Sequence, residues 1–93
     1  MKINSGDYIL NPDKKELYKV LKAYKDGVGI LYDIETIYPA PENLELWDWT
    51  QETYVSAPVD GLMYGVTRSY LRHLGKVISK KEGETIKILY FSS

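Results

Sequence analysis

Short runs of apolar residues, separated by turn signals, predict a chain built mainly from β-strands. Tyr8-Ile9-Leu10 stops at Asn11-Pro12-Asp13, a strong turn signal, and predicts part of a first strand. Val28–Ile34 is rich in the β-branched and aromatic residues that strands favour. Leu44–Trp49 alternates between apolar and polar residues, which predicts a half-buried strand, and Thr50–Ser56 either continues this strand or turns back.

The stretch before Val28 fits two structures. Four apolar residues recur at the spacing of an amphipathic helix: Leu17, Val20, Leu21 and Tyr24. Asn11 can cap such a helix, and Pro12 suits its first position. Against this, Asp26-Gly27 between two apolar runs is a standard hairpin signal. We favour the hairpin and keep a helix over residues 12–25 as the alternative.

The last third of the chain predicts a short helix and a closing hairpin. Thr67 can cap the helix, and Gly75 can end it in the left-handed conformation. Four residues around this helix are spaced to face the core: Val66, Tyr70, Leu71 and Leu74. Residues 76–81 and Thr85–Phe91 then predict two strands joined by a turn at 82–84. The second of these runs is apolar on both faces, so it predicts a central strand or an edge that pairs with another chain.

Gly6–Leu10, Leu17–Leu21 and the run after Asp26-Gly27 follow one another as a meander of three strands. A helical turn at Ser69–Leu74 then precedes a closing strand at 76–79. This order resembles the small SH3-like β-barrels. The resemblance implies a mainly β fold, a small partly open barrel or meander with one short helix; α+β is the alternative if the helix before Val28 forms. It implies a binding fold and transfers no functional residue, because fold does not fix function.

Length and composition indicate a single globular domain over residues 1–93. A hydrophobic fraction of 44% and a charged fraction of 27% are ordinary for such a domain. Prolines 39, 41 and 58 frame an insertion at about residues 39–60, because proline breaks regular structure. No run approaches the roughly 20 apolar residues of a membrane-spanning helix, and the N-terminus lacks the apolar core of a signal peptide. We therefore expect a cytoplasmic protein, of a bacterium or, if phage-encoded, of an infected host cell.

The residue inventory argues against catalysis, so we expect no enzyme, no catalytic residue and no cofactor. The chain has no cysteine and a single histidine, His73, which excludes a disulfide framework, a thiolate zinc site and a histidine-rich metal site. It also lacks a nucleophile-elbow pattern and a phosphate-binding loop. His73 lies in the last turn of the predicted helix, where it complements the helix dipole.

Charge divides the chain more sharply than the net value of −1 suggests. Residues 1–39 are neutral overall, residues 40–60 carry five acids and no base, and residues 61–93 carry a net charge of +4. The acidic segment also holds both tryptophans. We predict that it recognises a protein with a basic surface, since tryptophan and tyrosine are common interface anchors and the acids would steer a basic partner. The candidate residues are Trp47, Asp48, Trp49, Glu52 and Tyr54.

A simpler interpretation is that the tryptophans fill the core of a domain with one phenylalanine. If they do not, small stand-alone binding modules of this kind are common among phage accessory and inhibitor proteins. Such a role is one expectation for this chain.

An alternative site lies in the basic C-terminal third. Arg68 and Arg72 are four residues apart on the predicted helix and hence on one face. With Tyr64 and Tyr70 they could hold a nucleotide or another phosphate-bearing ligand at a subunit interface, since arginine binds phosphate bidentately. A solvated helix face is the simpler interpretation. Nucleic acid is disfavoured by the pI of about 5.8. A homo-oligomer in which the acidic segment meets the basic third of another subunit is left open.

Overall fold

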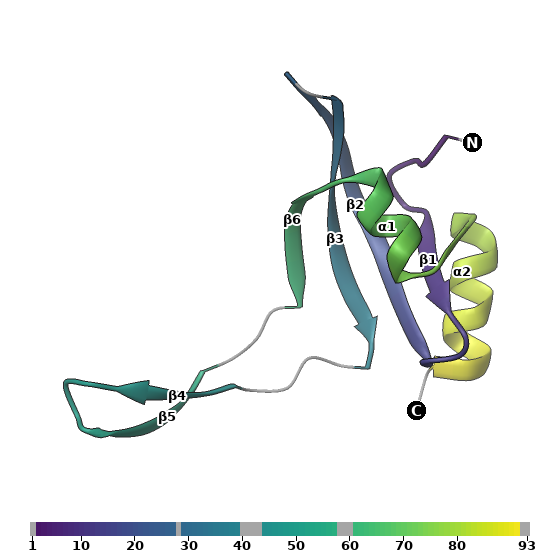
Figure 1. Ribbon diagram of the computed structural model, residues 1–93. Helices are drawn as coiled ribbons and strands as arrows, with labels where there is room; N and C mark the ends of the chain where they lie inside the picture. Colours follow the sequence, from purple (N-terminus) through teal and green to yellow (C-terminus); the bar gives the residue numbers. More distant parts are fainter. Residues whose placement is uncertain (1, 28, 40–43, 58–60, 92–93) are drawn as a thin grey trace.

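The computed structural model describes residues 2–27, 29–39, 44–57 and 61–91, and it contains a five-stranded antiparallel sheet with a separate hairpin (Figure 1). The sheet has the order β6-β3-β2-β1-β7. Its strands are β1 (Tyr8–Asn11), β2 (Glu16–Asp26), β3 (Gly29–Tyr38), β6 (Leu62–Val66) and β7 (Lys76–Ile78). The hairpin consists of β4 (Leu44–Asp48) and β5 (Thr53–Ala57). The helical elements are α1 (Arg68–Leu74), α2 (Lys80–Ile86) and the π-helical turn η1 (Lys87–Phe91).

The predicted β character is confirmed, and the alternative helix over residues 12–25 is wrong. β2 and β3 pair antiparallel, with Asp26 opposite Gly29. Register shifts at Leu17/Tyr18 and between Val20 and Lys22 interrupt the alternation of β2. Leu17 belongs to one buried cluster and Val20 to the other, so the apolar residues at helical spacing do not share a face.

The sheet is open. Along the described strands β6 and β7 form its two edges and do not pair with each other, so these residues form no closed barrel. β6 was not predicted. It pairs with β3 through an irregular register, and Gly65 within it has a φ of 66°, in the left-handed region that favours glycine.

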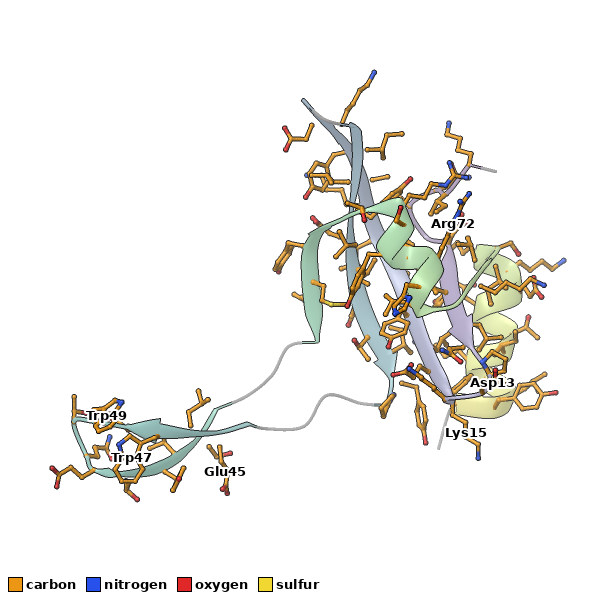
Figure 2. The ribbon with its side chains drawn as sticks, viewed as in Figure 1. Asp13, Lys15, Glu45, Trp47, Trp49 and Arg72 are labelled. Atoms are coloured by element: carbon orange, nitrogen blue, oxygen red, sulfur yellow. The ribbon has the colours of Figure 1, made fainter. Side chains whose placement is uncertain are left out.

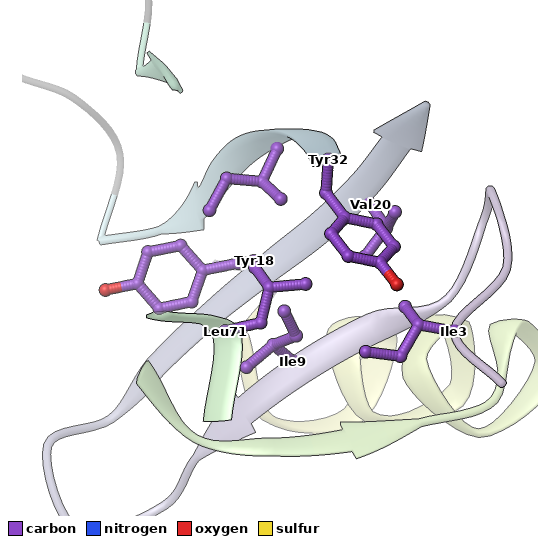
Figure 3. Packing of buried hydrophobic residues seen from close by; sticks show 7 residues of the cluster. Ile3, Ile9, Tyr18, Val20, Tyr32 and Leu71 are labelled. Atoms are coloured by element: carbon purple, nitrogen blue, oxygen red, sulfur yellow. The ribbon is translucent and has the colours of Figure 1, made fainter. Parts of the chain in front are cut away.

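The two faces of the sheet carry separate apolar clusters, because successive residues of a strand point to opposite sides. Ile9 of β1 belongs to the larger cluster, which Leu71 of α1 covers (Figure 3). The neighbouring Tyr8 belongs to the smaller cluster, against which Ile86 of α2 and Phe91 of η1 pack. Each face therefore has its own helical cover. Among the described residues, no helix is long and apolar enough to cross a membrane.

The helix α1 forms where the sequence predicts it. Thr67 caps its N-terminus, and the Tyr70 amide donates to Thr67 Oγ1 at 3.2 Å. Leu71 is fully buried, but Tyr70, predicted to face the core, is 42% exposed. The prediction for Gly75 is also wrong, because its φ of 166° is extended rather than left-handed. Glycine is needed there for space: a Cβ would lie 2.8 Å from the carbonyl carbon of Leu10.

The predicted C-terminal hairpin is wrong beyond residue 79, because residues 80–91 are helical. Ser79 caps α2, and the Glu82 amide donates to Ser79 Oγ at 3.2 Å. Gly83, predicted to lie in a turn, is buried in α2 against Tyr8. The apolar run at the C-terminus splits: Ile86 and Phe91 pack on the sheet, whereas the residues between them are exposed.

Candidate functional site

The hairpin of β4 and β5, residues 44–57, is called the arm. It forms a sheet of its own and projects away from the five-stranded sheet, between the end of β3 and the start of β6 (Figure 1). Residues 40–43 and 58–60 of the predicted acidic insertion, which include Glu42 and Asp60, lie outside the described residues. The second half of the segment turns back on the first, and Trp47 lies opposite Tyr54.

An aromatic cluster holds the two strands of the arm together (Figure 2). The ring centroids of Trp47 and Tyr54 are 5.1 Å apart with an interplanar angle of 74°. Those of Trp47 and Trp49 are 5.9 Å apart at 81°. Edge-to-face pairs of this kind contribute about 0.5–1.5 kcal/mol each beyond the area that they bury. An isolated two-stranded hairpin is marginal in water, so this cluster is the main stabilising feature of the arm.

Much of this aromatic surface is nevertheless open to solvent. Trp49 is 83% exposed, Tyr54 65% and Trp47 41%. Neither tryptophan belongs to the two buried clusters, so the interpretation that they fill the core is wrong. On the opposite side of the arm Leu46, half exposed, pairs with Val55.

The turn of the arm is built around Asp48. Its Oδ1 accepts from the Thr50 amide at 2.8 Å, from Thr50 Oγ1 at 2.6 Å and from the Gln51 amide at 3.4 Å. The hydrogen bonds from Thr50 lower the pKa of the Asp48 carboxyl below its ordinary value. Glu52 takes the left-handed conformation, with a φ of 52°, as the chain reverses. The Asp48 carboxylate therefore holds the turn, while Glu45 and Glu52 are exposed.

The arm is acidic as well as aromatic. Glu45, Asp48 and Glu52 give residues 44–57 a charge of −3, and this stretch contains no lysine or arginine. All five residues singled out from the sequence thus lie on one small hairpin: Trp47, Asp48, Trp49, Glu52 and Tyr54.

The residues of the alternative site are only partly brought together. Arg68 and Arg72 both line a cavity of about 240 Å³ that Lys76 also borders. Tyr64 and Tyr70 line neither this cavity nor its neighbour. The Tyr70 hydroxyl donates instead to Met63 Sδ at 3.8 Å, and Tyr64 is exposed on β6.

A second cavity, of about 560 Å³, adjoins the first and shares Ile3 and Arg68 with it. Its apolar walls include Ile3, Ala23 and Ile30, and its cations are Lys2, Lys25 and Arg68. We call the two cavities together the cationic groove. No aspartate or glutamate is among the described residues that line it. Lys2 and Lys25 were not singled out from the sequence, since only the fold places the first residues and the β2–β3 turn beside α1.

An apolar cavity of about 480 Å³ lies at the other end of the sheet, between the turn after β1 and η1. Tyr38 and Phe91 meet there with ring centroids 4.9 Å apart. Among the described residues no group of three potential metal ligands gathers.

Comparisons of the chain with protein-family models, with curated proteins and with solved structures each found no match.

Proposed function

We propose that the protein is a non-enzymatic binding module that recognises another protein through the arm. The observation that carries the proposal is the exposed aromatic cluster: Trp49, the most exposed of its rings, is held by Trp47 on a hairpin that stands apart from both buried clusters. Rings positioned in this way offer a large apolar area at low cost in conformational entropy. Such residues dominate the binding energy of many interfaces.

The chemistry of the arm specifies its partner. The acids around the rings favour a cationic surface and slow the approach of acidic proteins. The rings themselves favour a recess with apolar walls, because exposed tryptophan gains most when water is excluded from it. A basic protein surface with an apolar depression therefore fits the arm best.

The resemblance to SH3-like barrels belongs to the same proposal. In support of it, α1 directly precedes β7, and β7 pairs antiparallel with β1. α2 and η1 at the C-terminus are additions to that pattern. An SH3-like body would supply a rigid platform for the arm and would not by itself identify what the arm binds.

The test uses the fact that both tryptophans of the chain lie on the arm, so tryptophan fluorescence reports on the arm alone. Immobilised wild type, a Trp47→Ala/Trp49→Ala variant and a Tyr64→Ser control are exposed to an extract of cells that express the gene. A protein retained by wild type and control but lost with the double variant is purified and titrated against wild type. We expect a blue shift of the tryptophan emission. A purified partner that binds the folded double variant as tightly as wild type would overturn the proposal.

A second candidate function rests on the smaller cavity. Arg68, Arg72 and Lys76 line it, and among the described residues no carboxylate does, which suits a phosphate-bearing small ligand. Inorganic phosphate and nucleotides are added in a thermal-shift assay. A ligand at 100 times its dissociation constant stabilises the native state by about 2.7 kcal/mol. A shift in wild type that Arg72→Ala abolishes supports this function, and no shift with any of these ligands rejects it.

A further inference from the structure

We infer that the surface recognised by the arm is the cationic groove of a second copy of this chain. The inference rests on the proposed function, because it names the partner of the same arm. It accounts for a feature that an arm directed at a foreign protein leaves unexplained: the chain itself carries the complementary surface.

Charge is the first argument. Residues 40–60 carry −5, whereas residues 1–39 are neutral and residues 61–93 carry +4. The arm, residues 44–57, carries −3 and the rest of the chain carries +2, which together give the net −1, so the arm and the rest of the molecule are of opposite sign. Two copies attract each other in the orientation that brings an arm to a body, and they repel each other when arm meets arm.

The shapes and surfaces match in more detail. The arm combines an exposed aromatic cluster with three acids, Glu45, Asp48 and Glu52. The larger cavity of the groove has the complementary composition, with apolar residues, two lysines and an arginine in its lining. Its volume of about 560 Å³ lies within the range of small-molecule pockets, so it can admit one indole ring. Lys2 and Lys25 would then lie beside the ring and the carboxylates, where cation–π and ionic contacts add to burial.

The topology directs the arm to another molecule rather than to its own. The arm leaves the sheet after Tyr38, at the end of β3, whereas Ile30, near the start of β3, lines the groove. Ile30 and Tyr38 are eight residues apart along β3, which separates these points by about 26 Å at about 3.3 Å per residue. In Figure 1 the arm extends from the end of the sheet opposite the β2–β3 turn. A head-to-tail contact follows, which closes as a ring or a reciprocal dimer, or extends as a chain.

The test is light scattering and sedimentation of the full chain from micromolar to near-millimolar concentration. Wild type should exceed the mass of a monomer and dissociate between about 0.1 and 1 M salt, over which the Debye length falls from about 10 to 3 Å. Trp49→Ala, on the arm, and Lys2→Glu/Lys25→Glu, on the groove, should each weaken association by at least about 30-fold, the effect of losing one interface anchor. A Lys14→Glu/Lys81→Glu control changes the charge equally outside the groove and should associate as wild type does.

Mixing the two defective variants provides a test that misfolding cannot imitate. Each is monomeric alone, but the groove variant keeps an intact arm and the Trp49→Ala variant keeps an intact groove. Together they should form a heterodimer with one complete contact, and tryptophan emission from the intact arm should shift to the blue. Failure of the mixture to associate would overturn the inference.

The remaining outcomes separate this inference from the proposed function. A wild type that is monomeric throughout overturns the inference, while recognition of another protein by the arm still stands or falls on the extract experiment. Association lost with Trp49→Ala but kept with Lys2→Glu/Lys25→Glu overturns the groove as partner and supports the arm. Association kept in both variants overturns the inference.

Discussion

Gly83→Ala should destabilise the protein, although alanine is the better helix former. Gly83 lies in the middle of α2 and is buried against Tyr8, which is 2% exposed. A Cβ at this position would lie 2.7 Å from Tyr8 Cβ and closer still to Cγ and Cδ1 of the ring. These atoms are near the backbone of β1, so the ring cannot turn away and α2 must move outward instead.

The expected magnitude follows from two opposing terms. Replacing glycine by alanine within a helix gains about 1 kcal/mol. Overpacking a well-filled core costs about 1–3 kcal/mol, and three atoms inside contact distance place this site at the upper end. The net loss is about 1–2 kcal/mol, which lowers the melting temperature by roughly 4–16 °C in a domain of this size. Denaturant and thermal unfolding followed by circular dichroism measure both quantities.

Two comparisons make the reasoning refutable. Glu84→Ala, at the exposed neighbouring position of α2, should leave stability nearly unchanged. In a Tyr8→Ala background the cost of Gly83→Ala should shrink, because Cγ and Cδ1 of the ring are gone. If Gly83→Ala stabilised the wild-type protein, α2 would not be seated on Tyr8 at this residue, and the assignment of residues 80–86 to a helix on this face would be wrong.

Three further predictions concern pH and the arm. Burial, with a smaller effect of Glu16, raises the pKa of Tyr18 from 10.0 to about 12. The tyrosine of the unfolded state therefore ionises first, so the stability that is present below pH 10 should fall as the pH rises toward 12. Urea unfolding at several pH values measures this loss, which should be smaller in Tyr18→Phe. Hydrogen bonds from Thr50 are the main cause that lowers the pKa of Asp48 from 3.8. The carboxylate therefore supports the turn above pH 3.8, and this support is lost as the pH falls through the lower pKa of the folded state. Tryptophan fluorescence of the wild type should change over this acidic range, and Asp48→Ala should show the changed fluorescence at neutral pH. Trp47→Ala removes two edge-to-face contacts, so hydrogen exchange at residues 44–57 should accelerate. The melting temperature of the body should stay within about 4 °C, since surface changes away from the core lie within about ±0.5 kcal/mol.

The parts of the fold that follow from local signals were predictable from the sequence. Asp26-Gly27 marks the end of β2 and the start of the β2–β3 hairpin, because a short turn needs only its own residues and the strands beside it. Thr67 marks α1 in the same way, since a cap acts within one turn of helix. β6 escaped prediction, as Gly61 directly before it and Gly65 within it obscure the strand pattern.

The C-terminal segment shows why local reasoning fails elsewhere. Ser79 followed three residues later by Glu82 is the sequence pattern of a capping box, so a signal for the start of α2 was present in the sequence. The prediction instead took residues 82–84 as a turn, because glycine is common in turns. The reason for glycine at 83 is Tyr8, some seventy residues earlier in the chain, whose ring occupies the space of a side chain. No pattern within the segment contains that information.

The candidate site divides along the same line. The alternation over Leu44–Trp49 predicts a strand, in which Trp47 and Trp49 share one side, and their ring contact agrees with this. Whether the rings fill the core or face water depends on the packing of the rest of the chain. The groove is harder still to predict, since Lys2, Lys25 and Arg68 come from three separate segments that meet only in the folded protein.

The position of the tryptophans outside the core has an energetic consequence for binding. A domain of 93 residues has a limited core, and burying apolar surface stabilises by about 25 cal/mol per Å². This chain fills both clusters with aliphatic residues and tyrosines, and it leaves its two largest side chains on the arm. Much of the free energy of burying them, above all that of Trp49, is thus not used in folding and becomes available when a partner covers the arm. The arm is held mainly by its own aromatic contacts, so the binding of a partner should also stabilise the folded arm. In this division of roles, Trp47 supports the arm and Trp49 contacts the partner. Substitution of Trp49 should accordingly weaken binding with little change in the arm, whereas substitution of Trp47 should affect both.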